Sequence, residues 1–181
     1  MSRSQSPWWL IALVAVVLAG TGVTVLQQAA LAAYCPDPQE QRFLTLINNY
    51  RAQNGVGRLK LVKNLGTAAD FHSRDMGRRD FFSHDSSHGT PTDRARRFGY
   101  TGAFCCGENI AWGGPSLNAD QVFEVWRTSE DGHNEAMLNG SYRAIGIGRY
   151  FDSTFRNNGY VGPADIWTTV FGGQPAASPR C

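Results

Sequence analysis

The chain of 181 residues carries little excess charge. It has 17 Lys and Arg residues against 15 Asp and Glu residues, which gives a formal net charge of +2. The segments RRDFF and DRARRF hold short runs of arginine, but each also contains an aspartate. Nucleic acids and anionic membranes require clustered basic side chains, so this composition excludes a nucleic-acid-binding protein. We interpret the two arginine runs as solvated helix faces.

Several motifs of metal binding and catalysis are also missing. No Cys-x-x-Cys pair occurs, which argues against a thiolate metal site. No His-Glu-x-x-His segment occurs, so the helix typical of zinc proteases is excluded. Neither Ser83 nor Ser129 lies in the glycine-flanked motif of a nucleophile elbow. The sequence contains no internal repeat and no low-complexity tract.

The first 32 residues have the layout of a secretory signal. Arg3 precedes an apolar run at residues 8–19, and Ala30-Leu31-Ala32 fits the small-residue pattern of a cleavage site. We therefore predict a signal peptide over residues 1–32 and a single secreted domain over residues 33–181. The alternative is an uncleaved membrane anchor, because residues 8–26 approach the roughly 20 residues that span a bilayer.

The four cysteines are Cys35, Cys105, Cys106 and Cys181. Outside the cytoplasm an even number of cysteines favours disulfides. A bond between the neighbours Cys105 and Cys106 fits disulfide geometry poorly. We therefore expect each terminal cysteine to pair with one of these two, in either arrangement. A lipid anchor on Cys35 is disfavoured by the bulky Tyr34 before it.

Helical periodicity dominates the first two thirds of the domain. Asp37, Pro38 and Glu40 form a capping box, and apolar residues follow at helical spacing as far as Asn54-Gly55. Further helices are predicted from about Asn64, over Pro91–Phe98, and from the cap Asn118. The side chains expected to face inward are Phe43, Leu46, Ile47, Tyr50, Leu65, Ala69, His72, Met76, Val122, Val125 and Trp126.

The remainder of the chain changes to the period of strands. Residues 142–151 and 164–173 alternate in the manner of strands, and the second is apolar on both faces. Asn158-Gly159 between them is a hairpin turn signal. Helices first and a hairpin last indicate an α+β fold, with helices packed on an antiparallel sheet.

Histidine and acidic residues suggest a site. In FFSHDSSHGT (residues 81–90) the serines and Gly89 disfavour a helix, so His84 and His88 do not form a helical metal pair. Phe81 and Phe82 are expected to bury and leave His84 at the rim. His72 falls on an apolar stripe and is interpreted as a core histidine.

The segment GENIAWGG (residues 107–114) is interpreted as a glycine-lined loop. A carboxylate such as Glu108 beside apolar residues needs a partner or a role. It either anchors the loop by accepting backbone N–H groups or binds a metal or ligand. With His84 and with His133, which follows a helix, it supplies the two imidazoles and one carboxylate of an open zinc site. Many sequences contain this set, so the spacing alone is a weak signal.

The order of the motifs FFSH, GENIA, VWRTS, DGHNEAML, AIGIG and IWTTVFGG resembles the bacterial branch of the CAP superfamily. This superfamily comprises cysteine-rich secretory proteins, antigen 5 and pathogenesis-related proteins, which share the SCP domain. The resemblance covers a core at about residues 40–173. It implies a CAP-like α-β-α sandwich, a central antiparallel sheet with helices on both faces. It also implies a cleft with histidines and acids that can bind a divalent cation such as Zn²⁺.

The resemblance assigns His84, Glu108 and His133 to this cleft as metal- or ligand-binding residues. Two departures stand out. Bacterial members usually have two residues between the helix serine and the histidine, whereas Glu130, Asp131 and Gly132 stand here, so Glu130 is a possible additional ligand. Animal and plant members have a second histidine on the late strand, where this chain has Ile166.

Three functions follow as hypotheses. The first is a secreted or envelope-tethered binding domain that takes up a divalent cation, a small ligand, a lipid or an envelope component, without turnover. Its membrane contact would be limited to residues 8–26, if these are retained. The second is a metal-dependent, peptidase-like hydrolase with Glu108 as general base. The third is a structural or adhesive extracellular module.

Overall fold

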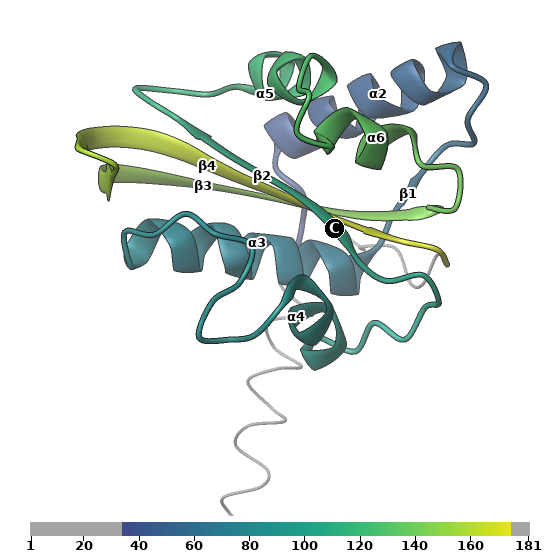
Figure 1. The fold of residues 1–181 in the computed structure, drawn as a ribbon, viewed down its shortest axis with the longest axis horizontal. Helices are drawn as coiled ribbons and strands as arrows, with labels where there is room; N and C mark the ends of the chain where they lie inside the picture. Colours follow the sequence, from purple (N-terminus) through teal and green to yellow (C-terminus); the bar gives the residue numbers. More distant parts are fainter. Residues whose placement is uncertain (1–33, 175–181) are drawn as a thin grey trace, which may run out of the picture. The chain divides into compact units, whose positions relative to one another are not determined.

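The structure is a computed structural model that describes residues 34–174, which belong to one compact unit beginning at Tyr34 (Figure 1). The predicted signal peptide or anchor and Cys181 lie outside the described residues. Within residues 34–174 no helix is long and apolar enough to cross a membrane. The elements follow in the order α2 (Pro38–Gln53), β1 (Lys60–Leu61), α3 (Lys63–Arg78), α4 (Pro91–Arg97), β2 (Gly107–Gly113), α5 (Ala119–Arg127), α6 (His133–Leu138), β3 (Ala144–Asn157) and β4 (Tyr160–Gly172).

The sheet has the strand order β1-β3-β4-β2. Strands β3 and β4 form an antiparallel hairpin, β2 runs antiparallel to β4, and the short β1 pairs in parallel with β3. The predicted antiparallel arrangement is confirmed. The strands extend further toward the turn than predicted, because Asn158 and Gly159 both adopt a positive φ and close the hairpin with only two residues.

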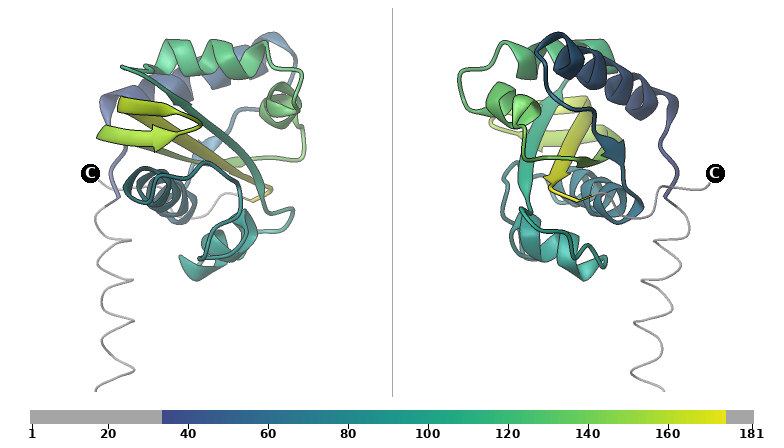
Figure 2. Two further views of the ribbon diagram at one scale, coloured as in Figure 1. Left: turned by 60° about the vertical axis from the view of Figure 1, so that its left-hand side comes forward. Right: turned by 90° about the vertical axis from the view of Figure 1, so that its right-hand side faces the viewer.

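Helices cover both faces of the sheet. Helices α2, α5 and α6 lie on one face, and α3 and α4 lie on the other (Figures 1 and 2). The predicted α-β-α sandwich is therefore confirmed. Strand β4 is buried on both sides, as its two apolar faces indicated: Trp167 and Phe171 pack toward the first layer, and Ile166 and Val170 pack toward the second.

Reciprocal caps fix where the helices begin. At α2 the Asp37 carboxylate accepts from the Glu40 amide at 2.7 Å, and the Glu40 carboxylate accepts from the Asp37 amide at 2.9 Å. The predicted capping box is confirmed. Thr90 forms the same arrangement at α4 and Asn118 at α5. Each box satisfies amide groups that a helix start leaves without intrahelical partners.

Aromatic side chains fill the core beneath α2 and α5. The ring of Phe43 meets those of Trp126 and Trp167 at centroid distances of 5.3 Å and 6.1 Å. The prediction that Val125 faces this core is wrong, since its side chain is 50% exposed. Phe123 is buried instead, because positions 119, 122, 123 and 126 share one helical face.

On the opposite face, α3 lies directly against β3. Gly146 and Gly148 of β3 touch the backbone of α3 at Leu65 and at Ala69 and Asp70. A side chain at either glycine would overlap these backbone atoms. The helix therefore approaches the strand as closely as it does because these two positions lack a Cβ atom.

The cysteine pairing differs from the one expected. The structure joins Cys105 to Cys106, so neither of them pairs with a terminal cysteine. The expectation rested on the strain that a disulfide between adjacent residues places on their peptide bond. The bond between Cys105 and Cys106 is cis, with the Cα atoms 3.0 Å apart. Cys35 also takes part in a disulfide.

The contact between α3 and β3 yields a test of stability. Replacing Gly148 with alanine is expected to lower the free energy of unfolding by about 3 kcal/mol, because the added methyl group overlaps the backbone of α3. Urea unfolding at 25 °C measures the change. Gly140→Ala is the matched control: nothing lies within 4 Å of its added methyl group, and the change should stay within about 0.5 kcal/mol. Equal stabilities for the two variants would contradict the close approach.

Candidate functional site

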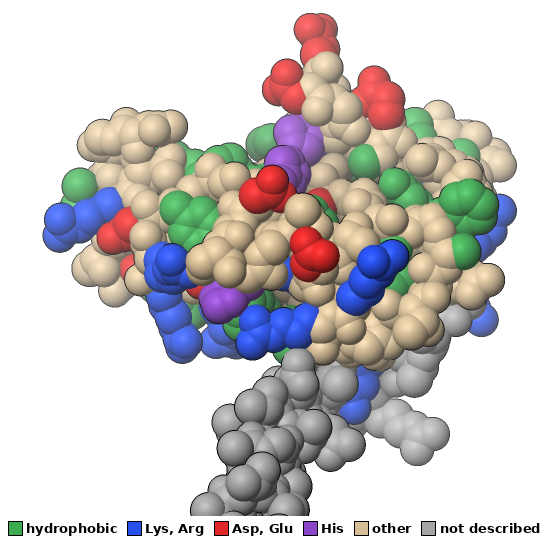
Figure 3. Space-filling model, turned by 60° about the horizontal axis from the view of Figure 1, so that its bottom comes forward, with side chains coloured by type: hydrophobic (Ala, Val, Ile, Leu, Met, Phe, Trp, Pro, Cys, Tyr) green, Lys and Arg blue, Asp and Glu red, His purple; other side chains and the backbone are tan. Residues whose placement is uncertain are grey.

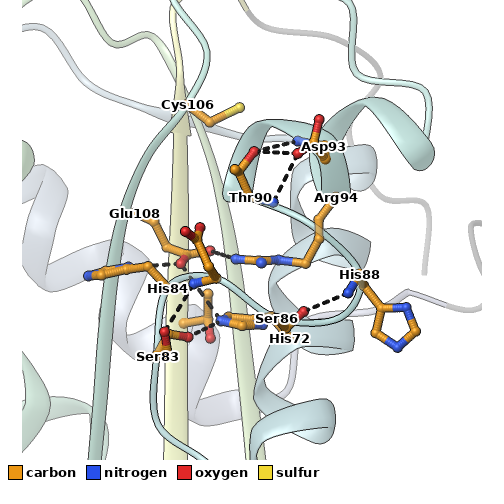
Figure 4. A network of polar contacts seen from close by, with 12 residues as sticks. His72, Ser83, His84, Ser86, His88, Thr90, Asp93, Arg94, Cys106 and Glu108 are labelled. Atoms are coloured by element: carbon orange, nitrogen blue, oxygen red, sulfur yellow. Dashed lines mark hydrogen bonds and ion pairs between the residues drawn. The ribbon is translucent and has the colours of Figure 1, made fainter.

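Glu108 lies on strand β2 and not in a loop. The interpretation of GENIAWGG as a loop is wrong, because residues 107–113 pair in register with β4 and place Glu108 opposite Val170. The Glu108 side chain is only 1% exposed. It points toward the layer of α3 and α4 (Figure 4). A carboxylate at such depth requires strong partners.

Its main partner is Arg94 of α4. A guanidinium nitrogen of Arg94 donates to Glu108 Oε2 at 2.7 Å, and a second donates to the carbonyl oxygen of Gly89 at 2.8 Å. Arg94 is completely buried, so the interpretation of DRARRF as a solvated face is wrong for this residue. The sequence did contain a signal: Arg94 shares a helical face with Phe98, and an arginine on an apolar face implies a buried acid.

The second oxygen of Glu108 holds His84. His84 Nδ1 donates to Glu108 Oε1 at 2.9 Å, and the His84 side chain remains 51% exposed. Since a carboxylate only accepts hydrogen bonds, the proton of the neutral imidazole sits on Nδ1. The lone pair of Nε2 is then left for solvent or a ligand.

The prediction that Phe81 and Phe82 are both buried is wrong for Phe82. Phe82 is 36% exposed, whereas Phe81 is partly buried.

His72 contacts the loop that carries Ser83 and His84. It is fully buried, as predicted, and its Nε2 donates to the carbonyl oxygen of Ser83 at 2.9 Å. The same nitrogen lies 3.8 Å from Glu108 Oε1, too far for a hydrogen bond. Among the described residues His72 Nδ1 has no hydrogen-bond partner. Burial lowers the pKa of His72 to about 4, against the opposing charge of Glu108.

His133 is the first residue of α6, in the other layer. Its Nδ1 lies 2.7 Å from Ser129 Oγ, and its ring stacks on Trp126 at a centroid distance of 6.4 Å. Its carbonyl oxygen accepts from Asn109 Nδ2 at 3.1 Å. Gly132 before it adopts a φ of 86°, which favours glycine and lets α6 begin there.

Burial and neighbouring charges together set the pKa of His133. Partial burial lowers the pKa of His133 below its ordinary value, the charge of Asp131 opposes this, and the charge of His84 adds to it. Glu135 also raises this pKa. Figure 3 shows histidine side chains gathered at the surface beside acidic ones. We call His84, Glu108 and His133 the histidine site.

Other candidate residues lie outside the histidine site. His88 packs on Phe71 at 4.9 Å, and its ring nitrogens face Asp75 and Arg97 at 3.7 Å and 3.3 Å. Glu130 is exposed, and its side chain forms no hydrogen bond or ion pair within the part of the chain that the structure describes. Across residues 34–174 no three His, Cys, Asp or Glu side chains are arranged to hold a metal ion.

A cavity of about 350 Å³ lies away from the histidine site, so this cavity is not the cleft that was predicted around His84, Glu108 and His133. Its lining contains none of the residues of the histidine site and consists of Phe104, Cys105, Cys106, Asn139, Ser141 and Tyr142. The histidine site is defined by the polar contacts of its side chains.

The model of the cysteine-rich secretory protein family, CAP, matches residues 44–171. The chain belongs to this family. The resemblance seen in the motifs is thereby confirmed, and the domain described here is a CAP domain. At position 166 this CAP domain has an isoleucine that is fully buried beside Met76, so the late-strand histidine of animal and plant members has no counterpart there.

Bacterial and human proteins are similar in sequence. The uncharacterized protein YkwD of Bacillus subtilis is 30% identical over 155 residues, which cover 85% of this chain and 52% of YkwD. The uncharacterized membrane protein YlbC of the same organism is 32% identical over 120 residues, 64% of this chain and 34% of YlbC. The human Golgi-associated plant pathogenesis-related protein 1 is 28% identical over 117 residues, 56% of this chain and 66% of its own. The chain spans about half the length of YkwD and a third of YlbC.

Solved structures share the fold. An extracellular protein containing an SCP domain from Bacillus anthracis superposes with a TM-score of 0.61 and 24% identity, over 78% of this chain and 45% of that protein. An outer surface protein of Borrelia burgdorferi has a TM-score of 0.62 and 20% identity, over 78% of this chain and 96% of its own. At these identities the similarity supports the CAP sandwich alone.

The buried His72 makes stability depend on pH. Its pKa is about 4 when folded and 6.5 when unfolded, so between these values the unfolded chain binds a proton that the folded protein does not. The stabilisation is complete above pH 6.5 and is lost as the pH falls toward 4. From pH 7 to pH 4.5 this group should remove about 2 kcal/mol of unfolding free energy.

His72→Gln is expected to lose this part of the pH dependence, because glutamine does not titrate. Urea unfolding of both proteins at pH 7 and pH 4.5 measures the difference. Identical losses on acidification in the two proteins would show that His72 does not carry the effect.

Proposed function

We propose that this CAP domain is an extracellular or envelope-tethered binding module whose histidine site takes up a divalent cation, or a small ligand together with that cation, without turnover. The observation that carries the proposal is the contact between His84 and Glu108. Metal-binding histidines usually donate their second ring N–H to a carboxylate, which fixes the ring and leaves the other nitrogen for the ion. His84 has this arrangement: Nδ1 contacts Glu108, the other end of the ring is directed away from it (Figure 4), and the side chain is half exposed.

The residues suit a cation bound mainly by imidazoles. Both oxygens of Glu108 are committed, one to Arg94 and one to His84. That leaves the Nε2 atoms of His84 and His133 as donors, so the three-ligand set expected from the sequence is reduced to two. Asp131 and Glu135 lie close enough to His133 to act on its pKa and add negative charge nearby. With two protein donors, water or a ligand would fill the other positions of a tetrahedral ion.

A metal-dependent hydrolase is less well supported. A general base needs a free lone pair within reach of the proton it removes. Glu108 is 1% exposed and paired with a permanent cation. A purely structural or adhesive role agrees with the connected network but leaves the exposed nitrogen of His84 without a purpose.

The proposed location draws on two supports. The apolar segment at residues 8–26 is followed by a small-residue cleavage pattern, and two proteins that share the fold are described as extracellular or outer surface proteins. An oxidising compartment would also suit disulfide bonds among the four cysteines. The tethered form would retain residues 1–32.

Zinc binding is tested by thermal unfolding of the chelated protein with and without added zinc. At 100 times the dissociation constant, one bound ion should add about 2.7 kcal/mol, or roughly 6–10 °C in Tm. His84→Ala and His133→Ala should each lose most of this shift. His88→Ala is the matched control, since His88 lies outside the histidine site, and it should keep the shift. A wild-type protein that does not respond to zinc, or a His84→Ala variant with the full shift, would overturn the proposal.

Export is tested by N-terminal sequencing of material released by cells that express the full gene. The pattern Ala30-Leu31-Ala32 predicts that the released protein begins at Ala33. Protein found only in the membrane fraction with its N-terminus intact would favour the anchor.

A further inference from the structure

A single arginine decides what the histidine site can hold. We propose that Arg94 is the specificity-determining residue of this site: its guanidinium takes the position beside Glu108 that a metal ion would occupy, so the site excludes Ca²⁺ and Mg²⁺ and accepts ions that prefer imidazole, such as Zn²⁺. The acceptance of Zn²⁺ rests on the proposed function. The exclusion of Ca²⁺ and Mg²⁺ concerns Arg94 and Glu108 alone and is testable separately.

Arg94 occupies one oxygen of Glu108 permanently. The guanidinium stays protonated at any pH at which proteins are folded. Arg94 donates to Glu108 Oε2 at 2.7 Å, and His84 Nδ1 takes Oε1 at 2.9 Å. Both carboxylate oxygens therefore have a donor. An ion binding directly to Glu108 would have to displace a charge-assisted hydrogen bond inside the protein.

The surroundings of Arg94 hold its side chain in one position. Its side chain is completely buried, and its second contact, to the carbonyl oxygen of Gly89, is 2.8 Å long. Thr90 and Asp93 form the capping box that starts α4, and the glycine at position 89 lies against the Asp93 side chain. The helix start thus holds Gly89, whose carbonyl oxygen accepts from the guanidinium. Swinging Arg94 out would leave the buried carboxylate of Glu108 without its cation.

The donor atoms that remain for an ion are mainly imidazole nitrogens. Ca²⁺ and Mg²⁺ are bound by oxygen ligands, chiefly carboxylates, whereas imidazole suits Zn²⁺, Cu²⁺ and Ni²⁺. With Glu108 committed, the donors of the histidine site are the imidazoles of His84 and His133. The nearby carboxylates of Asp131 and Glu135 act on the pKa of His133, but no group of three metal-type side chains forms within residues 34–174.

The experiment compares the purified full-length wild type with Arg94→Met, which keeps much of the side-chain volume and removes the charge. Thermal unfolding is recorded after chelation, without an ion and with Zn²⁺, Ca²⁺ or Mg²⁺. The wild type should respond to Zn²⁺ and not to Ca²⁺ or Mg²⁺. Without an ion, Arg94→Met should unfold roughly 10 °C lower, because Glu108 loses its counter-charge in the interior. Ca²⁺ should then restore several degrees, and Zn²⁺ should stabilise this variant more than it stabilises the wild type.

Two further variants serve as controls. Arg96→Met makes the same change at an exposed position of the same helix and should behave as the wild type in every condition. The double variant R94M/E108Q removes both charges, so it should fold better than R94M alone and lose the response to Ca²⁺. The gain of Ca²⁺ binding would thereby be assigned to the carboxylate of Glu108.

The outcomes separate this inference from the proposed function. A wild type that ignores Zn²⁺ refutes the proposed function, yet a Ca²⁺ response confined to R94M still supports the role of Arg94. A wild type that binds Ca²⁺ as well as Zn²⁺ overturns the inference. So does a folded R94M that does not respond to Ca²⁺, or an R94M chain that stays unfolded in its presence, because the freed carboxylate is expected to be satisfied by the ion.

Discussion

The buried ion pair between Arg94 and Glu108 is the constraint on which the functional face of this CAP domain depends. It joins α4 to β2, and through the remaining oxygen of Glu108 it sets the orientation of His84. Both charges are nearly inaccessible to water, so each is stable only in the presence of the other. A pair of this kind contributes little net stability, but it allows one arrangement of the loop, the helix and the strand and penalises the others.

Strand β2 links the two helical layers at this face. Successive residues of a strand point to opposite sides, and β2 uses this alternation at Glu108 and Asn109. Glu108 holds Arg94 and His84 in the layer of α3 and α4, while Asn109 donates to the carbonyl oxygen of His133 in the layer of α6. The histidine site therefore takes one imidazole from each layer. Its geometry depends on the spacing across the sandwich, which the glycines of β3 and the aromatic core help to fix.

The sequence predicted the sandwich, the α2 capping box, the hairpin turn and the burial of His72, because each leaves a local pattern or a family motif. It missed the partner of Glu108. Arg94 lies in a run of charged residues that has the appearance of a solvated face. Its place on the helical face of Phe98 was a signal of burial, but only tertiary contact pairs it with Glu108. The glycines at both ends of GENIAWGG favoured the interpretation as a loop. The strand forms through pairing with β4, which is a non-local property.

The pairing of β1 with β3 has a consequence for how the domain forms. Lys60 pairs with Ala144 and Leu61 with Ile145. Strand β2 pairs with β4, which lies at the end of the domain. Contacts so distant along the chain cannot form until most of the polypeptide is available, and topologies dominated by them fold slowly. The sheet of this domain can therefore be completed only after nearly all of its residues have been synthesised.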